Sequence, residues 1–298
     1  MSSPEKQSPP PQSCTFLSLP YDIQLTCVAR ISRHNSASHW YILCRKPDKT
    51  LTNSIKSAGY VLARVPVPVP APAHLTHVSV GSCIYSFSRW GSLSVSVMDC
   101  QSHMWAEAPR FPVNLVIRSA SVFDQKIYVA ALGRNKVGDS FPNYFAVFDT
   151  KTQHLDPLPL PCTDKNFCLR DCYSACIDGK FYVMAGDSDV AAYDPKEGRW
   201  DLTRSRMSRF MYDDSYCVIG NVLYSFFFEK LQWYDSEGRN WRDLQGLVGL
   251  PKLPTARHVT LADYGGKMVV LWKNETTYDD DMSHGCSFFF WSCVSRML

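Results

Sequence analysis

The sequence predicts an all-β repeat fold in which each unit is a small sheet of short antiparallel strands. Three observations predict it. An aromatic-aspartate-aromatic pattern recurs from residue 74 to the C-terminus. The 298-residue chain is 45% hydrophobic and 20% charged, so it can bury a substantial core. Its most apolar stretches, residues 222–228 and 288–291, are much shorter than the roughly 20 residues that a membrane-spanning helix needs.

The first element of each repeat is a turn-like group followed by a strand that carries a tyrosine. Groups such as Asp178-Gly179-Lys180 and Ile219-Gly220-Asn221 come directly before these strands. This arrangement is typical of a hairpin turn that leads into a buried strand. We therefore expect four tyrosines on inner strands of their sheets: Tyr85, Tyr128, Tyr182 and Tyr224.

The second element is an apolar run that ends in aspartate, with a large apolar residue six positions later. The four aspartate and apolar pairs are Asp99 and Trp105, Asp149 and Leu155, Asp194 and Trp200, and Asp235 and Trp241. The aspartates are 50, 45 and 41 residues apart, a period that accommodates four short strands and their turns. Each aromatic anchor is expected to bury about 150–250 Å² between sheets, with its OH or NH group reaching a backbone partner.

A weaker fifth copy begins at Tyr264-Gly265-Gly266-Lys267 and continues with a strand over 268–272. It has neither the aspartate nor the tryptophan of the other copies. The aromatic run from Cys286 to Val294 can supply one more strand.

These units resemble the kelch motif, whose repeats are the blades of a β-propeller, over about residues 74–272. The resemblance implies that residues 74–298 form five units of a kelch-type β-propeller. Kelch units usually carry a glycine pair after the second strand, whereas here single glycines remain at Gly133 and Gly186, and Phe87 and Phe227 occupy that region in two copies. The repeats are therefore expected to be degenerate.

In such a propeller, the short turns 123–126 and 149–153 lie on one face. The opposite face carries the loops 89–92 and 133–144 and the connections 109–118 and 203–214. Loops on a rigid scaffold often bind partners, and arginine mixed with aromatic residues is typical of interface hot spots. The candidate partner-binding residues are Arg89, Trp90, Arg204, Arg206, Arg209, Phe210 and Tyr212. The alternative is that these residues form ordinary solvated loops.

The N-terminal region divides into a Pro/Ser-rich tail over 1–14, which we expect to be disordered, and an amphipathic helix within 15–33. This helix resembles the opening of an F-box, the motif that docks a protein onto the Skp-type adaptor of cullin ubiquitin ligases. The resemblance implies that five residues contact the adaptor: Leu19, Pro20, Ile23, Val28 and Ile31. The second helical half of the box is missing, so adaptor binding is expected to be weak or absent. Alternatively, the helix packs on the propeller.

Together, the two regions resemble the plant F-box/kelch-repeat family. Two strand-like runs, 40–45 and 60–65, are expected to form outer strands of a partial sixth blade, so that the propeller spans 39–298. Similar proteins continue beyond the position of Leu298, which predicts a shortened member whose closure is fragile. The implied function is a non-catalytic protein-interaction module, as in the substrate-recognition subunit of an SCF-type (Skp-cullin-F-box) ubiquitin ligase.

Charge and cysteine content limit the other classes of function. Lys and Arg number 31 against 28 Asp and Glu, which argues against nucleic acid or membrane as the main partner. The N-terminus has no apolar signal region, so the 12 cysteines are expected to be reduced thiols of an intracellular protein, cytoplasmic or nuclear. The protein partner itself is not named by any motif.

No motif predicts an enzyme or a cofactor. Phosphate-binding glycine loops and the Gly-x-Ser-x-Gly elbow do not occur. The thiol cluster of Cys162, Cys168, Cys172 and Cys176 lacks a usual zinc spacing, and Cys176 falls on a predicted strand. The acidic run 279–281 with His284 lacks the spacing of a calcium loop. Two alternatives stay open: an adaptor-independent kelch binding protein and a kelch-propeller metalloenzyme.

Overall fold

In the computed structural model, the described part of the chain comprises residues 40–45, 60–65, 75–273 and 286–292. Within 75–273, it leaves out these positions: 89–94, 103, 109–110, 112–113, 134–140, 162–166, 168, 170–171, 186–188, 212–214, 248–251, 254–258 and 265. The F-box-like segment 15–33 and its five candidate residues therefore lie outside the described residues.

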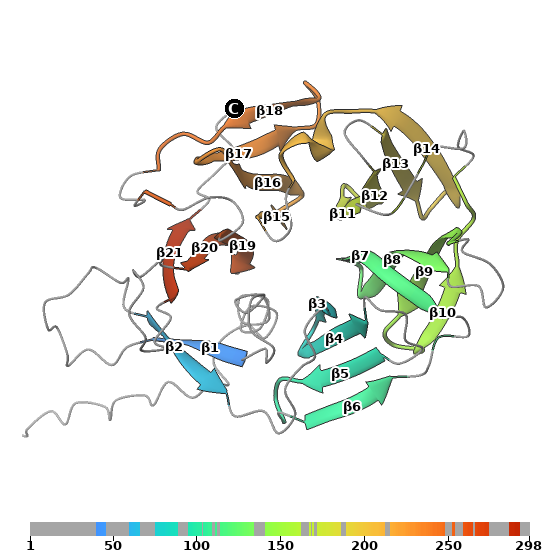
Figure 1. Ribbon diagram of the computed structural model, residues 1–298, viewed down its shortest axis with the longest axis horizontal. Helices are drawn as coiled ribbons and strands as arrows, with labels where there is room; N and C mark the ends of the chain where they lie inside the picture. Colours follow the sequence, from blue (N-terminus) through green and yellow to red (C-terminus); the bar gives the residue numbers. More distant parts are fainter. Residues whose placement is uncertain are drawn as a thin grey trace, which may run out of the picture.

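The described residues form antiparallel sheets arranged in a ring, as a β-propeller (Figure 1). Four blades have four strands each, in sequence order. Blade 1 consists of β3 (Leu75–Val80), β4 (Cys83–Ser88), β5 (Val95–Asp99) and β6 (Met104–Ala108). Blade 2 consists of β7 (Leu115–Phe123), β8 (Lys126–Gly133), β9 (Asn143–Asp149) and β10 (His154–Pro157).

Blade 3 consists of β11 (Cys172–Ile177), β12 (Lys180–Ala185), β13 (Asp189–Asp194) and β14 (Arg199–Arg204). Blade 4 consists of β15 (Tyr216–Ile219), β16 (Val222–Phe227), β17 (Lys230–Asp235) and β18 (Asn240–Asp243). A short 3-10 helix, η3 (Met207–Phe210), lies in the connection between these two blades.

Blade 5 has three strands: β19 (Val259–Tyr264), β20 (Lys267–Lys273) and β21 (Cys286–Ser292). A separate two-stranded sheet pairs β1 (Trp40–Arg45) with β2 (Tyr60–Val65). In the view of Figure 1, this sheet falls between blade 5 and blade 1 in the ring. The sequence thus correctly predicted the two N-terminal runs, the fifth unit and the C-terminal strand as β structure.

The first strand of each blade faces the centre of the ring, and neighbouring first strands contact one another around it (Figure 1). The four repeat tyrosines lie one strand further out, on β4, β8, β12 and β16, where all but Tyr182 are buried. These positions agree with the predicted inner strands. The predicted kelch-type propeller is confirmed.

The six-residue spacing of the repeat is the register of the hairpin between the third and fourth strands. In each blade, the residue before the aspartate pairs with the later apolar anchor: Met98 with Trp105, Phe148 with Leu155, Tyr193 with Trp200, and Tyr234 with Trp241. The anchors therefore occupy equivalent positions in all four blades. Two of them also make the predicted bond to the backbone, because the Nε1 groups of Trp200 and Trp241 donate to the carbonyl oxygens of Pro159 and Arg206.

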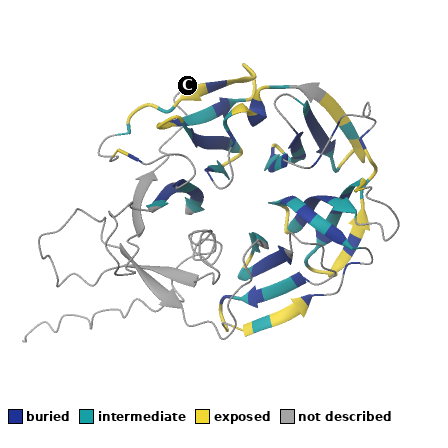
Figure 2. Cartoon of the chain, in the orientation of Figure 1, coloured by how far each residue is buried: buried dark blue, intermediate teal, exposed yellow. Residues whose placement is uncertain are grey.

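The hydrophobic core lies between adjacent blades. Four clusters of buried side chains join blades 1 and 2, 2 and 3, 3 and 4, and 4 and 5 in turn. Burial is greatest on the inner strands and falls towards the outermost strands β6, β10, β14 and β18, which are largely exposed (Figure 2). Each blade is thus held by its neighbours.

Two predicted connections were too long. Residues 109–118 were expected to be a connection, but β7 begins at Leu115, and Leu115 and Ile117 are buried in the cluster between blades 1 and 2. Likewise, residues 203–214 were expected to be a connection, but β14 extends to Arg204, because Asp189 pairs with it. Burial of alternate residues in the first case, and strand pairing in the second, continue the β structure into segments that look like loops.

Candidate protein-binding surface

The repeated aspartate closes the turn between the third and fourth strands of its blade. Its Oδ1 atom accepts backbone N–H groups two or three residues later: Gln101 at 2.8 Å for Asp99, Lys151 at 2.9 Å for Asp149, Lys196 at 2.9 Å for Asp194 and Gly238 at 3.0 Å for Asp235. Such side-chain bonds to the backbone are the usual reason for aspartate in a turn. Four carboxylates that recur in the sequence therefore have a structural role.

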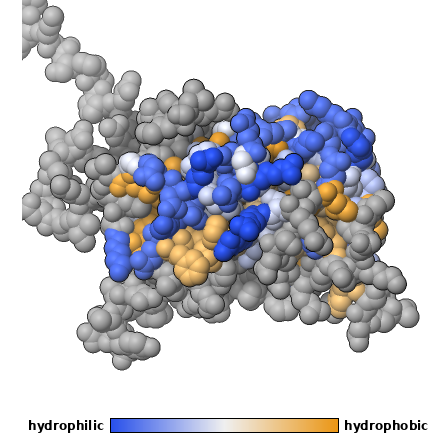
Figure 3. Space-filling view, turned by 90° about the horizontal axis from the view of Figure 1, so that it is seen from above, coloured by the Kyte–Doolittle hydropathy of each residue, from blue (hydrophilic) through white to orange (hydrophobic). Residues whose placement is uncertain are grey.

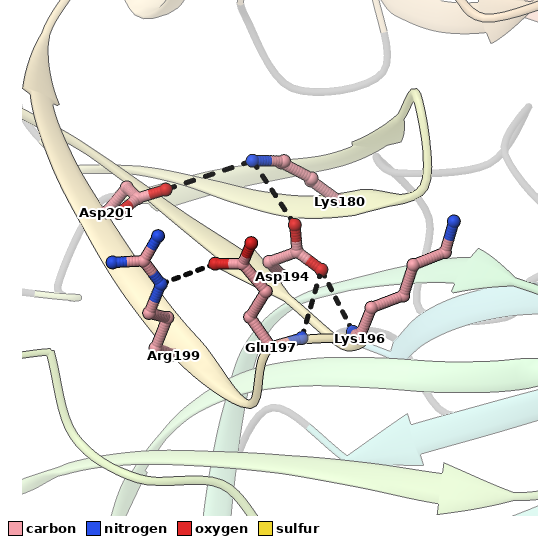
Figure 4. Close-up of polar contacts among 6 residues, drawn as sticks. All are labelled: Lys180, Asp194, Lys196, Glu197, Arg199 and Asp201. Carbon is pink, nitrogen blue, oxygen red and sulfur yellow. Dashed lines mark hydrogen bonds and ion pairs between the residues drawn. The ribbon is translucent and has the colours of Figure 1, made fainter.

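In Asp194, both carboxylate oxygens have partners (Figure 4). Its Oδ2 atom lies 3.3 Å from the Nζ atom of Lys180, which is also 3.8 Å from Asp201. The N–H group of Lys196 is the main cause that holds the pKa of Asp194 below its usual value, and Lys180 adds to the effect. Asp194 and Lys180 are therefore paired with each other within blade 3.

Replacing Asp194 with asparagine is expected to destabilise the fold at neutral pH and not at low pH. The folded-state pKa of Asp194 is lowered, so its charge stabilises the fold above about pH 4, and this contribution is lost as the pH falls through the lowered pKa. Urea unfolding at neutral pH and at about pH 3 measures the difference. The control is Glu237→Gln, which removes the charge of an exposed carboxylate in the equivalent turn of blade 4. If the difference in unfolding free energy between wild type and Asp194→Asn persists at low pH, the charge of Asp194 is not its cause.

The opposite end of the blades carries the predicted partner-binding residues that the structure describes. Arg206 and Arg209 are exposed and Phe210 is half-buried, all in the connection between blades 3 and 4. Arg204 is the last residue of β14, and nothing is described of its side chain. Three predicted residues, Arg89, Trp90 and Tyr212, lie outside the described residues.

The connection that contains η3 is fixed to blade 4 by polar bonds along its length. The Ser205 hydroxyl lies 2.6 Å from the Tyr234 hydroxyl, and the Trp241 Nε1 group donates to the Arg206 carbonyl at 2.9 Å. The Ser225 hydroxyl donates to the carbonyl of Phe210. Within the connection, the side chains of Met207 and Met211 are buried in the cluster between blades 3 and 4. A segment of irregular backbone is thereby held in one conformation.

Five rings form a continuous path from the core to the surface, which we call the aromatic row: Tyr234, Trp241, Phe210, Phe227 and Phe228. Successive ring centroids are 5.4, 5.8, 5.4 and 4.3 Å apart. Tyr234 and Trp241 are buried, whereas Phe228 is 79% exposed. The buried end therefore positions the exposed end.

Phe228 was not among the residues predicted from the sequence. It lies with Glu229 at the tip of the two-residue hairpin that joins β16 to β17, and both residues have positive φ, 47° and 61°. Asparagine, aspartate and glycine are the residue types that favour such a turn. The signal available in the sequence was the replacement of the kelch glycine pair by phenylalanine in this region.

The cations beside the aromatic row differ from those of the turn face. Among the described residues, no carboxylate pairs with Arg206 or Arg209, and the guanidinium of Arg209 lies over the Phe210 ring at 5.3 Å. By contrast, Arg242 pairs with Asp235 at 2.7 Å. Figure 3, which views the ring from the side of β17 and β18, shows hydrophobic surface directly beside strongly hydrophilic surface. The loop face of blade 4 thus combines one exposed ring, that of Phe228, with two exposed arginines that pair with no carboxylate of the described residues.

The thiol cluster and the acidic run of the sequence lie only partly within the described residues. Cys172 and Cys176 lie on β11, where burial raises the pKa of the Cys176 thiol, while Cys162 and Cys168 are outside the described residues. The acidic run 279–281 and His284 are also outside them. In the described ranges, no three His, Cys, Asp or Glu side chains come together as metal ligands do. Nor does any helix there have the length and apolar character needed to cross a bilayer.

The comparison with known proteins agrees with this architecture. The family described as "FKB95, Kelch-repeats domain" matches residues 40–286. F-box/kelch-repeat protein At5g51250 of Arabidopsis thaliana is 49% identical over 250 residues, which cover 80% of this chain and 67% of that protein. The chain belongs to the plant F-box/kelch-repeat family. The resemblance on which the sequence analysis rested is therefore confirmed.

Two other members of the family extend the match over more of the chain. F-box/kelch-repeat protein At3g06570 of Arabidopsis thaliana is 36% identical over 330 residues, which cover 94% of this chain and 84% of that protein. Putative F-box/kelch-repeat protein At5g38680 of Arabidopsis thaliana is 39% identical and covers 91% of this chain and 88% of its own length. Among solved structures, that of YjhT covers 70% of this chain and 74% of its own at 13% identity, with a TM-score of 0.49.

Proposed function

We propose that this chain is a non-catalytic recognition protein of the SCF type, in which the propeller, 39–298, binds a target protein and the segment 15–33 docks a Skp-type adaptor. The observation that carries the proposal is the exposed end of the aromatic row beside two exposed arginines, Arg206 and Arg209, for which the described residues supply no carboxylate partner. Aromatic and arginine side chains dominate the energetics of protein interfaces. The rings are preorganised, so little entropy is lost when they bind.

The relatives support the adaptor half of the proposal. Their names pair an F-box with kelch repeats. The match to At3g06570 covers 94% of this chain, more than residues 40–298 alone can account for, so the similarity extends into the N-terminal region. A single helix, however, offers only part of the roughly 800 Å² that each partner contributes to a standard interface. We expect the adaptor to be bound weakly.

Affinity purification of five forms of the full chain tests both halves together. Phe228→Asn is expected to lose the target protein and keep the adaptor, because it removes only the exposed ring. Ile23→Asp is expected to keep the target and lose the adaptor, because it places an unpaired carboxylate on the apolar face of the helix. Quantitative mass spectrometry against wild type measures both losses.

Each variant has a matched control. Phe123→Asn makes the same change at a phenylalanine that is 37% exposed on the turn face. Gln24→Asp adds the same charge at a polar position of the helix that the sequence predicts within 15–33. Both controls are expected to behave as wild type. If wild type captures no adaptor, the chain is an adaptor-independent kelch binding protein. If Phe228→Asn and Phe123→Asn retain the same partners, the loop face of blade 4 is not the recognition surface.

A further inference from the structure

The turn that carries Phe228 has an unfavourable sequence for its conformation. At the other two-residue hairpin tips in the described part of the chain, the central pairs are Gly81-Ser82, Asp124-Gln125, Asp178-Gly179 and Gly220-Asn221, and each contains at least one glycine, asparagine or aspartate. A bulky residue with φ of 47° is a conformational outlier, because its Cβ approaches the following carbonyl. Such outliers persist only where the surrounding structure holds them in place, and they are concentrated at active sites, ligand-binding sites and switch regions. The strained backbone at Phe228 therefore points to a ligand that contacts its ring.

The neighbouring rings leave Phe228 open to a partner. Its centroid lies 4.3 Å from that of Phe227 in an edge-on arrangement, and 79% of the residue remains exposed. An aromatic or large aliphatic side chain that covered this ring would bury apolar surface at little entropic cost. The apolar part of the partner is thus expected to lie against Phe228.

The charge of the partner follows from the cations beside the row. On the same face, Lys230 is already paired with Asp243 at 2.7 Å. Arg206 and Arg209 are exposed, and neither pairs with a carboxylate among the described residues. The Arg209 guanidinium is held over the Phe210 ring at 5.3 Å, which leaves its edge free to bind a carboxylate through two parallel hydrogen bonds.

Glu229 makes one side of this surface negatively charged, opposite the two arginines. It is exposed at the hairpin tip next to Phe228, while the two arginines belong to the connection that contains η3. A carboxylate on the partner is repelled at Glu229 and attracted towards Arg206 and Arg209. The acidic side of the partner must therefore lie towards η3.

We propose that the exposed end of the aromatic row binds a protein segment in which a large apolar side chain is flanked by aspartate or glutamate. This inference rests on the proposed function, because it names the chemistry of the segment that the same surface takes. The apolar side chain contacts Phe228, and the carboxylates pair with Arg206 and Arg209.

The strain at Phe228 is tested first, by thermal unfolding and binding of one pair of variants. Phe228→Asn places a residue that tolerates positive φ at the hairpin tip, so its melting temperature is expected to rise by about 2–4 °C. Phe123→Asn, at the end of β7, is expected to show no such rise. A lower melting temperature for Phe228→Asn would show that the ring stabilises the fold and is not retained for binding.

The chemistry of the partner is tested with synthetic peptides and the full-length chain. The probes are fluorescent peptides with a Leu-Phe pair, flanked on one side either by Glu-Asp or by Lys-Arg. Fluorescence anisotropy is expected to detect the acidic peptide and not the basic one, with weaker binding at high salt. Phe228→Asn is expected to reduce the affinity about 30-fold, as loss of an interface hot spot does.

Charge variants complete the test. Arg209→Gln is expected to lower the affinity for the acidic peptide, and Glu229→Gln is expected to raise it. Arg239→Gln removes the same charge as Arg209→Gln but from the turn face, so it is expected to leave the affinity unchanged. Equal binding of the two peptides, no binding of either, or an equal effect of Arg209→Gln and Arg239→Gln would overturn the inference. If the peptides fail but the target protein is still lost from Phe228→Asn on affinity purification, the proposed function stands and only the partner chemistry is wrong.

Discussion

Replacing Phe181 with alanine is expected to lower the free energy of unfolding by about 3–5 kcal/mol, as for other buried phenylalanines. Phe181 is 1% exposed and belongs to the cluster that joins blades 2 and 3. Its ring centroid lies 5.3 Å from that of Tyr128 in blade 2 and 6.1 Å from that of Trp200 in its own blade. The substitution leaves a cavity where the two blades meet, so each loses part of its support. Chemical denaturation measures the loss.

The matched control is Leu202→Ala in the same blade, because Leu202 is 48% exposed. Its cost is expected to stay within about 0.5 kcal/mol, as for surface positions in general. If Phe181→Ala does not fold, Phe181→Leu keeps most of the volume and gives a smaller, measurable loss. A cost for Phe181→Ala as small as that for Leu202→Ala would contradict a core that lies between the blades.

The repeat was predictable because its signals are local. An aspartate and an apolar residue six positions later belong to one hairpin, so Asp194 and Trp200 reveal the register without any knowledge of the ring. Local sequence was less informative where alternation is short. Leu115 and Ile117 follow a segment rich in proline and asparagine, and only their burial against blade 1 shows that β7 has begun.

The candidate surface could be predicted only in part for the same reason. Arg206, Arg209 and Phe210 are close in sequence, and their mixed chemistry indicated an interface. The row they join depends on contacts across the blade, such as that of Phe210 with Phe227 at 5.4 Å. The positive φ of Phe228 follows from the pairing of Phe227 with Lys230, and the residue types at these positions do not predict that pairing. Tertiary contacts therefore supplied what the sequence pattern could not.

The two ends of blade 4 differ in how fully their polar groups are paired. At one end of β17, Asp235 accepts the N–H group of Gly238 and pairs with Arg242. At the other end, the hairpin has a strained tip and a bulky exposed ring. Stability is highest where every polar group has a partner, and binding surfaces depart from this rule at a cost. The proposed binding surface of blade 4 coincides with the end of the blade that departs from this rule.

The second large effect concerns Trp241, the residue that couples the core to the candidate surface. Trp241→Phe keeps an aromatic ring but removes the Nε1 donor, so the Arg206 carbonyl loses its 2.9 Å hydrogen bond. The lost bond is expected to cost about 0.5–1.5 kcal/mol of unfolding free energy, because the Arg206 carbonyl still accepts the N–H group of Arg209 at 3.1 Å. The smaller ring also supports Phe210 less well, whose centroid lies 5.8 Å away. Both the arginine and the phenylalanine of the surface should become less fixed.

Trp200→Phe separates the loss of stability from the loss of recognition. Trp200 is the equivalent residue of blade 3, and its Nε1 group donates to the Pro159 carbonyl at 2.6 Å. The two variants are therefore expected to lose similar stability, measured by chemical denaturation, while only Trp241→Phe weakens the acidic peptide, measured by anisotropy. Equal weakening by both would mean that binding follows global stability. Weakening by Trp241→Phe alone would mean that the buried end of the aromatic row holds Arg206 and Phe210 in the conformation that binds.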